Sequence, residues 1–240
     1  MAQPPRRWRS TAILLTALGL GCGDPYVRWE PGQQAPAGQA PAAKPDAKPD
    51  AKPDAKAAKP SQPLGKILAD APLPLAQMLG QDPAQAESFL GPPLPGSKGE
   101  MRDKCVRYLP ERTWFRCRHA WQRYSDKTAK FGVVQLTFED GKVAGVAIEG
   151  LAGAGPFDPR KALAAVGLDL PGDPVVESPA PDVTVWNWWN TRARLRVHGR
   201  QHFVRVSAVE DSWERAKVEI VLNDVLTEDE KSRVITDAPQ

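Results

Sequence analysis

A proline-rich repeat early in the chain limits how much of it can fold. From Gly23 to about Pro63 the residues are mainly Pro, Ala, Gln, Lys and Asp, and Ala-Lys-Pro-Asp occurs three times in succession from Ala43. A segment with so few apolar residues cannot bury enough surface to form a core, and its prolines favour an extended backbone of ~3.1 Å per residue. We therefore expect residues 22–63 to form a disordered tether, with a recognition segment for a partner as the alternative.

The first residues have the organisation of an export signal. Arg6, Arg7 and Arg9 precede an apolar run over residues 11–20. This run is about half as long as the ~20 residues that a membrane-spanning helix requires. It is therefore typical of a signal peptide and too short for a membrane anchor.

The end of this run carries a cysteine motif. Leu18-Gly19-Leu20-Gly21-Cys22 resembles the lipobox of bacterial lipoproteins, with Gly19 where an aliphatic residue is usual. The resemblance implies that a signal peptide of residues 1–21 is removed, that Cys22 is acylated, and that Gly23 favours the outer membrane. Acyl chains contribute ~0.8 kcal/mol per buried methylene, so a multiply acylated cysteine anchors stably. An ordinary signal peptide with an incidental Cys22 is the alternative.

The two remaining cysteines form an even pair in a chain addressed to an oxidising compartment, which predicts a disulfide. Residues 104–109 and 113–118 have the composition of strands, and Pro110-Glu111-Arg112 has that of the turn between them. Folding this hairpin about its middle places Cys105 directly opposite Cys117, where cross-strand Cβ atoms are ~4.5–5.5 Å apart. We therefore expect a Cys105–Cys117 disulfide between directly opposed positions.

From about residue 64 the chain carries an internal repeat of turn and helix signals. The matched positions, at identical spacings, are Asp82-Pro83, Gly91 and Pro95-Gly96 in the first copy and Asp158-Pro159, Gly167 and Pro171-Gly172 in the second. Asp suits the N-cap of a helix, Pro its first turn and Gly its C-terminal end. Each copy therefore opens with a short helix. The apolar residues expected to pack on a sheet are Ala86, Phe89 and Leu90 in the first and Leu163 and Val166 in the second.

Strand signals follow each helix. They cover residues 105–109, 113–121, 133–138 and 143–148 in the first copy and 183–189, 193–197, 203–209 and 218–222 in the second. Asp140-Gly141 predicts a tight turn, and Gly199-Arg200-Gln201 predicts another. We predict an α+β fold of two tandem helix-plus-antiparallel-sheet repeats, residues 64–151 and 152–235, which pair into one globular region before a tail of residues 236–240.

Two short motifs in the first repeat point to a family. They are Phe89-Leu90-Gly91-Pro92-Pro93 at the helix end and the hairpin from Leu136 to Val143 around Asp140-Gly141. Together they resemble the small outer-membrane-assembly lipoproteins of the SmpA/OmlA type, and also their tandem relative, the beta-lactamase inhibitory protein. The resemblance covers about 70 residues of the first repeat and is fainter in the second. It implies a protein-binding α+β module without a catalytic centre.

The second repeat carries the candidate binding surface. Its members are Trp186, Trp188, Arg192, Arg194, Arg196 and Arg205. Alternation along a strand puts the first three of these arginines on one face. They either pair with the acidic residues of 210–230 or form a surface for an anionic envelope component or an acidic protein. The two indoles either pack in the core or form an aromatic platform for a partner or a sugar.

The residues that could carry chemistry form no recognisable catalytic or cofactor motif. Cys117 with His119, His198 and His202 is a conceivable zinc set, but cysteines of an exported chain usually oxidise. The carboxylates of residues 228–230 lie in polar surroundings, where solvation is the expected role.

These features together predict a cellular location and a general role. We expect a non-catalytic, lipid-anchored binding or scaffold protein that needs no cofactor and acts through a sheet surface. It would lie in the cell envelope, on the outer membrane and facing the periplasm. Its contacts would be the membrane, through the lipid, and an envelope protein or anionic envelope component, with nucleic acid excluded by the compartment. An envelope hydrolase acting on cell-wall or carbohydrate material is the alternative.

Overall fold

One large mixed β-sheet dominates the structure. The computed structural model describes residues 64–99, 102–127, 130–188 and 194–236, of which 46% are in strands and 15% in helices. The predicted signal peptide, the tether, Cys22 and all but the first residue of the predicted tail lie outside the described residues.

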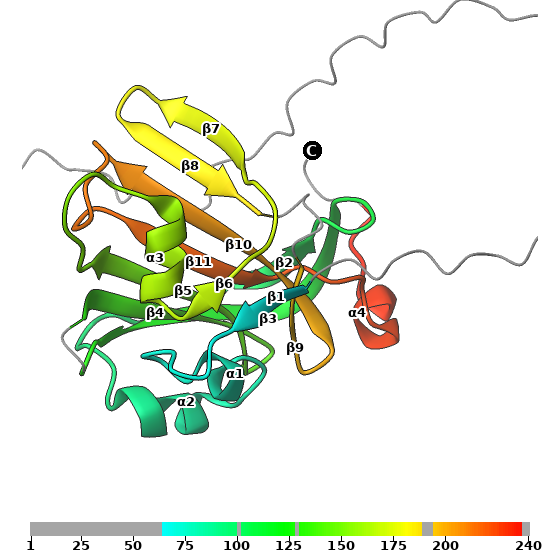
Figure 1. The fold of residues 1–240 in the computed structure, drawn as a ribbon. Helices are drawn as coiled ribbons and strands as arrows, with labels where there is room; N and C mark the ends of the chain where they lie inside the picture. Colours follow the sequence, from blue (N-terminus) through cyan, green and yellow to red (C-terminus); the bar gives the residue numbers. More distant parts are fainter. Residues whose placement is uncertain (1–63, 100–101, 128–129, 189–193, 237–240) are drawn as a thin grey trace, which may run out of the picture. The chain divides into compact units, whose positions relative to one another are not determined.

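The sheet has eleven strands, accompanied by four short helices (Figure 1). In chain order the elements are β1 (Leu64–Ile67), α1 (Leu75–Met78), α2 (Pro83–Leu90), β2 (Arg102–Arg107), β3 (Thr113–Ser125), β4 (Phe131–Glu139), β5 (Lys142–Leu151), α3 (Pro159–Ala165), β6 (Leu168–Asp169), β7 (Val175–Ala180), β8 (Val183–Asn187), β9 (Arg194–Val197), β10 (Arg200–Val209), β11 (Lys217–Leu222) and α4 (Glu228–Ser232). The strand order is β2-β3-β4-β5-β11-β10-β9-β1-β6, and β8 pairs with both β10 and β7.

The pairing of β5 with β11 joins the two halves of the sheet. The two strands are antiparallel and pair over five positions, from Lys217 opposite Glu149 to Val221 opposite Gly145. This seam continues the sheet without a break from the first half of the chain to the second. Residues far apart in the sequence therefore share one core.

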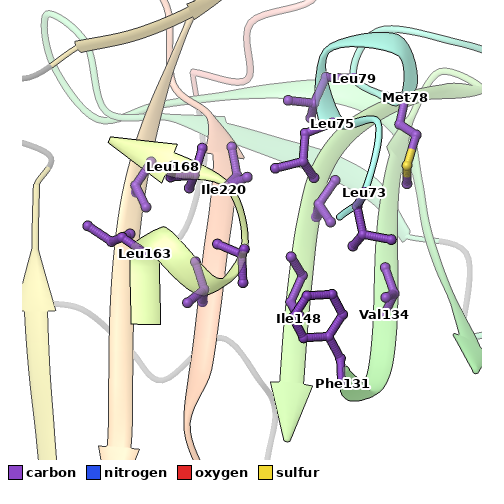
Figure 2. Close-up of a cluster of buried hydrophobic side chains, with 14 of the residues drawn as sticks. Leu73, Leu75, Met78, Leu79, Phe131, Val134, Ile148, Leu163, Leu168 and Ile220 are labelled. Atoms are coloured by element: carbon purple, nitrogen blue, oxygen red, sulfur yellow. The ribbon is translucent and has the colours of Figure 1, made fainter. Parts of the chain in front are cut away.

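That core lies on one face of the sheet. Val146 and Ile148 of β5 are paired with Ile220 and Val218 of β11, and all four are almost fully buried. The buried side chains of α1, α2 and α3 belong to the same cluster. Figure 2 shows Leu75 and Met78 of α1 and Leu163 of α3 in it, beside Ile148 and Ile220 of the sheet. Its helix members are Leu75, Met78, Ala86, Leu90, Ala162 and Leu163. These three helices therefore cover one face of the sheet and do not cover the opposite face.

The two predicted helices are confirmed, with the expected ends. Asp158 is the N-cap of α3, and its carboxylate accepts hydrogen bonds from the N–H groups of Arg160 and Lys161 at 2.8 and 3.3 Å. Asp82 occupies the same position before α2 without a side-chain cap bond. Gly91 after α2 has a φ of 83°, which L side chains rarely adopt, so glycine suits this helix end.

The predicted tight turn at Asp140-Gly141 is confirmed. Both residues have positive φ, and they join β4 to β5 as a two-residue hairpin loop. The second predicted turn is displaced by one residue, because His198 and Gly199 have the positive φ values and Arg200 already pairs with Val197. A two-residue loop of this kind ends before Arg200.

The predicted Cys105–Cys117 disulfide is present, with 5.7 Å between the Cα atoms. The predicted register is wrong, however, because Cys105 lies opposite Phe115. Arg107 is paired with Thr113, so the hairpin loop is centred on Pro110 rather than on Glu111, and the pairing at Cys105 is displaced by two residues from the predicted one. A separate one-residue irregularity of the β-bulge type lies farther along the ladder, between Arg102 and Lys104. The bond therefore joins diagonal rather than directly opposed positions.

The predicted fold class is wrong. The helices have only four to eight residues and form no layer equal to the sheet, so the molecule is mostly β and is not two helix-plus-sheet repeats. β1, which precedes the first predicted repeat's helix, lies between β9 and β6, which come from the second predicted repeat. The insertion of a strand from the first predicted repeat between strands of the second has no local sequence signal, because hydrophobic alternation identifies a strand but not its neighbours in the sheet.

The single-sided core predicts unequal effects of two adjacent substitutions in β11. Ile220→Ala removes a fully buried side chain from the core, so we expect it to lower the free energy of unfolding by about 2–5 kcal/mol. Val221→Ala acts on the opposite face, at a half-buried position, and is expected to cost about 1 kcal/mol. Urea denaturation of both variants measures the difference; equal losses would contradict a core confined to one face.

Candidate functional site

Five charged side chains cross the face of the sheet opposite the core. This charge ladder consists of Arg123 on β3, Glu149 on β5, Lys217 and Glu219 on β11, and Arg205 on β10. Arg123 Nη2 lies 2.6 Å from Glu149 Oε2, and Lys217 Nζ lies 3.8 Å from Glu149 and 2.8 Å from Glu219. The Arg205 guanidinium pairs with the other side of the Glu219 carboxylate. Every member of the ladder therefore has an opposite charge beside it.

Strand register explains this alignment. Glu149 is paired with Lys217, and Glu219 is paired with Arg205, so the charges of three strands come to lie side by side. Cross-strand pairs of opposite charge contribute about 0.2–1 kcal/mol each. The ladder thus strengthens the seam between β5 and β11.

An aromatic and apolar row borders the charge ladder on the same face. Successive pairings place Trp121, Thr137, Gly145, Val221 and Phe203 in one line across β3, β4, β5, β11 and β10. Four of these side chains are half-buried, so the row is partly open to solvent. We call this row and the charge ladder together the open face.

The electrostatics of the open face favour the ionised form of Glu219. Burial acts to raise the pKa of Glu219, but Arg205 and Lys217 outweigh it, and the pKa of this carboxyl is lowered. The face carries three cations and two anions in fixed positions. Fixed charges of both signs suit recognition of a complementary surface.

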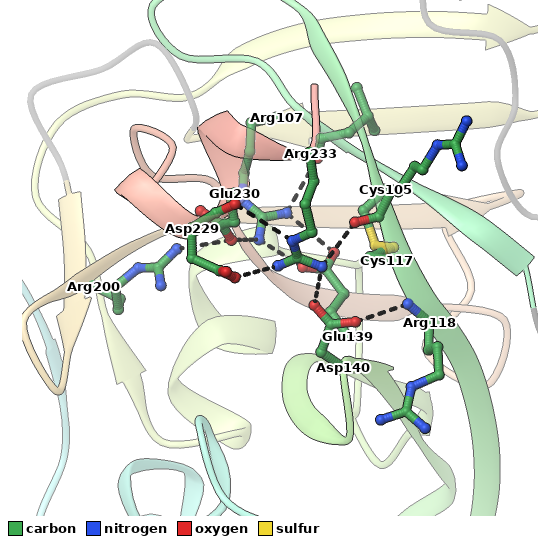
Figure 3. The surroundings of a disulfide bond; sticks show 12 residues. Cys105, Arg107, Cys117, Arg118, Glu139, Asp140, Arg200, Asp229, Glu230 and Arg233 are labelled. Carbon is green, nitrogen blue, oxygen red and sulfur yellow. Dashed lines mark hydrogen bonds and ion pairs between the residues drawn. A yellow bond between two sulfur atoms is a disulfide. The ribbon is translucent and has the colours of Figure 1, made fainter. Parts of the chain in front are cut away.

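A second cluster of charges lies at one end of the sheet, near the disulfide (Figure 3). Arg107 of β2 is 1% exposed and bonds both oxygens of Glu139, at 3.1 and 2.6 Å, and Glu230 of α4 at 2.9 Å. Arg200 lies 3.5 Å from Glu230, and Arg233 bonds Asp140 and Asp229, each at 2.7 Å. We call this group of side chains the ion-pair cluster.

The C-terminal segment forms one side of this cluster. Thr227 caps α4 through a reciprocal capping box with Glu230, in which the N–H of Thr227 donates to Glu230 Oε2 at 2.8 Å. Beyond the helix, Ile235 N–H donates to the carbonyl of Trp114 at 2.9 Å. The two glutamates and Arg107 therefore tie β2, β4 and the end of the chain together.

The pKa values of the two glutamates move in opposite directions. Burial raises the pKa of Glu139, although its bonds to Arg107 oppose the change. Burial also acts to raise the pKa of Glu230, but the hydrogen bond from Thr227 and the charges of Arg107 and Arg200 outweigh it and lower the value. Paired carboxyl groups whose pKa values differ in this way are found in catalytic acid–base pairs. Here, however, the Arg107 Nη2 atom donates to both carboxylates and occupies the space between them.

The two tryptophans of the predicted binding surface lie away from the open face. Trp186 packs on Phe157, with 5.3 Å between the ring centroids, and both lie against the core cluster. Trp188 is 1% exposed, and its indole N–H donates to the carbonyl of Gly172 at 3.3 Å. Neither indole therefore lies on the open face.

The two predicted arginines whose side chains are described lie on the same side of the sheet. Arg205 belongs to the charge ladder, and Arg196, exposed on β9, is paired with Gln201, which faces the same way as Arg205 along β10. Arg192 lies outside the described residues, as does the side chain of Arg194, whose backbone pairs with Leu64. The pairing of Arg205 with Glu219 agrees with the alternative in which these arginines pair with the acidic residues of 210–230.

The conceivable zinc set is not assembled. Cys117 is bonded to Cys105, so its sulfur is not available as a thiolate ligand. Within the described ranges, no group of three or more His, Cys, Asp or Glu side chains has the arrangement of a metal site. No helix in the same ranges is long and apolar enough to cross a membrane.

Sequence reasoning missed the ion-pair cluster. Glu230 was expected in solvated surroundings but is 8% exposed and bonded to Arg107. The signal that could have located it is Thr227-x-x-Glu230, the pattern of a capping box at a helix start. Burial of Arg107 had no such signal, because lone arginines in a hairpin are mostly exposed.

Comparisons with known proteins add no family. The chain matches no protein-family model, no curated protein and no solved structure. Its function therefore has to be inferred from the geometry above.

The ion-pair cluster predicts a large effect of removing its central cation. Arg107→Ala leaves two glutamates buried beside each other, and we expect a loss of about 3–5 kcal/mol in the free energy of unfolding. Adding Glu139→Gln should recover part of this loss, because one of the two like charges is then removed. Chemical denaturation measures both variants. Arg116→Ala, at an exposed position on β3, is the control and should stay within ~0.5 kcal/mol of the parent; a similar loss there would refute a special role for Arg107.

His202 predicts a pH-dependent stability. Burial lowers the pKa of this 4% exposed histidine to about 4. Since an unfolded histidine titrates near ~6.5, the unfolded chain binds more protons between these values, and the free energy of unfolding should fall by on the order of 3 kcal/mol as the pH drops through this window. His202→Leu should remove most of that slope in denaturation curves taken from pH 7 to pH 4. Burial and Arg102 also lower the pKa of His119, so a smaller slope should remain; an unchanged slope would exclude His202 as the main cause.

Proposed function

We propose that this chain is a lipid-anchored protein of the cell envelope that binds another protein through the open face, without catalysis. The open face carries the proposal, because an aromatic and apolar row lies beside fixed charges on the side of the sheet opposite the core. Protein interfaces are enriched in Trp, Phe and Arg, and their ion pairs set orientation more than affinity.

The proposed cellular location rests on the N-terminal sequence and is compatible with the fold. The run ending at Cys22 resembles a lipobox, and the tether that follows would extend the folded part away from a membrane surface. The Cys105–Cys117 disulfide supports an oxidising compartment. Together they favour an outer-membrane lipoprotein whose folded part faces the periplasm.

The alternative of an envelope hydrolase finds less support. A glycoside hydrolase needs two carboxyl groups about 5–9.5 Å apart with room for the glycosidic bond between them. Glu139 and Glu230 are the paired buried carboxyls of the ion-pair cluster, but the Arg107 guanidinium fills the space between them. The geometry of this pair therefore favours a structural role over hydrolysis.

Site-specific cross-linking in cells that produce the full-length chain tests the proposal. A benzophenone amino acid is placed at Gln135 or Ser207, on the open face, and at Gln85, which is exposed on α2 over the other face. We expect one protein adduct shared by Gln135 and Ser207 and absent from Gln85. Phe203→Ala should reduce its yield at least about tenfold, since aromatic hot spots typically carry 2 kcal/mol or more.

The same preparations test the lipid anchor, and two kinds of result would contradict the proposal. The intact mass of the membrane-bound chain should correspond to a start at an acylated Cys22 and should increase by two hydrogens on reduction of the disulfide. An adduct formed equally from Gln85, or one insensitive to Phe203→Ala, would reject the open face as the interface. An unacylated mass would reject the anchor while leaving the interface open to test.

A further inference from the structure

One face of the β2–β3 hairpin presents cationic and apolar side chains that belong neither to the open face nor to the ion-pair cluster. Strand alternation places them together, because the residues between them are buried on the other face, around the disulfide. Arg112, in the turn, joins them by lying over the Trp114 ring, with its Cζ atom 5.2 Å from the ring centroid. We call this set the hairpin patch; its members are Lys104, Val106, Arg112, Trp114, Arg116 and Arg118.

The four cations of the hairpin patch are exposed and lack an acidic partner. None of them forms an ion pair with a carboxylate in the described part of the chain, and this includes Asp103 and Glu111 of the same hairpin. Arg118 donates its backbone N–H to Asp140, which forms its ion pair with Arg233, and the Arg118 guanidinium points away from the ion-pair cluster (Figure 3). Five of the exposed side chains of residues 102–118 are cations and two are acids, which gives them a net charge of +3.

Two of these cations lie directly opposite each other. Lys104 of β2 is paired with Arg116 of β3, and like charges at opposed positions destabilise a sheet. On the open face, the corresponding position pairs opposite charges, as in Glu149 with Lys217. An anion bound between Lys104 and Arg116 would offset their repulsion. The hairpin patch therefore has the features of an anion-binding surface.

The composition of the hairpin patch favours the headgroups of an anionic bilayer over an acidic protein. All its charged members have one sign, which matches a uniformly anionic surface, whereas the open face has fixed charges of both signs. Val106 and Trp114 are also opposed and are half-buried, so they offer apolar surface among the cations. Tryptophan is enriched where a protein meets the boundary between headgroups and acyl chains.

We propose that the hairpin patch docks on the anionic headgroups of a lipid bilayer. Its four cations lie at the lipid phosphates, to which guanidinium groups donate charge-assisted hydrogen bonds, and Trp114 lies at the boundary with the acyl chains. The patch shares no side chain with the open face. Docking therefore places the hairpin on a membrane without using the surface proposed to bind a protein.

Vesicle co-sedimentation tests the docking. The protein is residues 22–240 with Cys22→Ser, which retains every residue that the structure describes and carries neither an acyl group nor the basic export signal. The probes are vesicles of phosphatidylglycerol and phosphatidylcholine in equal amounts, and vesicles of phosphatidylcholine alone. At low ionic strength we expect at least about tenfold stronger partition into the anionic vesicles, and most of this preference should disappear at about 0.5 M NaCl.

Charge reversal of the opposed pair tests the assignment to the hairpin patch. Lys104→Glu/Arg116→Glu keeps the pair like-charged, so the stability of the hairpin should change little. At about fivefold in affinity for each basic residue near an anionic surface, partition into the anionic vesicles should fall about 25-fold or more. The matched control, Lys127→Glu/Lys161→Glu, makes the same change in net charge at exposed positions beyond the far end of β3 and on α3, and should stay within about threefold of the parent. Near-UV circular dichroism checks that each variant is folded.

A cross-link in cells separates a lipid from an acidic protein as the ligand. A benzophenone amino acid is placed at Glu111, at the exposed end of the hairpin, in the full-length chain. We expect a lipid adduct that is lost in Lys104→Glu/Arg116→Glu. A discrete protein adduct with the same sensitivity would assign the hairpin patch to a protein and overturn the proposal.

Two vesicle results would also overturn it: equal partition into the two kinds of vesicle, or equal losses in the charge-reversed pair and its matched control. Because the vesicle experiment uses a chain without an acyl group and leaves the open-face side chains unchanged, such a failure does not affect the proposed lipid anchor or the proposed protein-binding function. Loss of the adducts from Gln135 and Ser207 likewise leaves the hairpin patch intact.

Discussion

The antiparallel pairing of β5 with β11 is the constraint on which the rest of the structure depends. It joins strands about 70 positions apart in the chain into one sheet, and it aligns Val146 and Ile148 with Ile220 and Val218 on the buried side. The same register aligns Glu149 with Lys217 on the other side. One set of backbone hydrogen bonds therefore defines both the core and the charge ladder, since adjacent residues of a strand point to opposite faces.

The two faces have different energetics. Burial of apolar surface by α1, α2 and α3 supplies most of the stabilisation on the core side, at ~25 cal/mol per Å². The charged side gains only modest amounts from its paired side chains, because all of them except Glu219 remain partly hydrated. A face that contributes little to folding can vary in sequence at low cost to stability, which makes it suited to recognition of a partner.

The ion-pair cluster differs from the charge ladder in that its central cation is buried. Arg107 is almost completely buried, and its charge is stabilised only because Glu139 and Glu230 reach it from two other segments. A buried charge without such partners would be strongly unfavourable. The disulfide in the adjacent β2–β3 hairpin and the capping box of α4 hold the three segments in place, so the cluster couples the end of the chain to the sheet.

The sequence by itself determined the local features: the helix that begins after Asp158, the Asp140-Gly141 turn, the strands around them and the pairing of Cys105 with Cys117. Each of these depends on neighbours within a few residues or on a short hairpin. Only the tertiary structure decided which strands pair, the hairpin register that puts Cys105 opposite Phe115, the insertion of β1 between β9 and β6, and the burial of Arg107 and Glu230. The physical reason is that hydrophobic alternation and turn propensity act over a few residues, whereas strand order and buried ion pairs are selected by the free energy of the whole sheet.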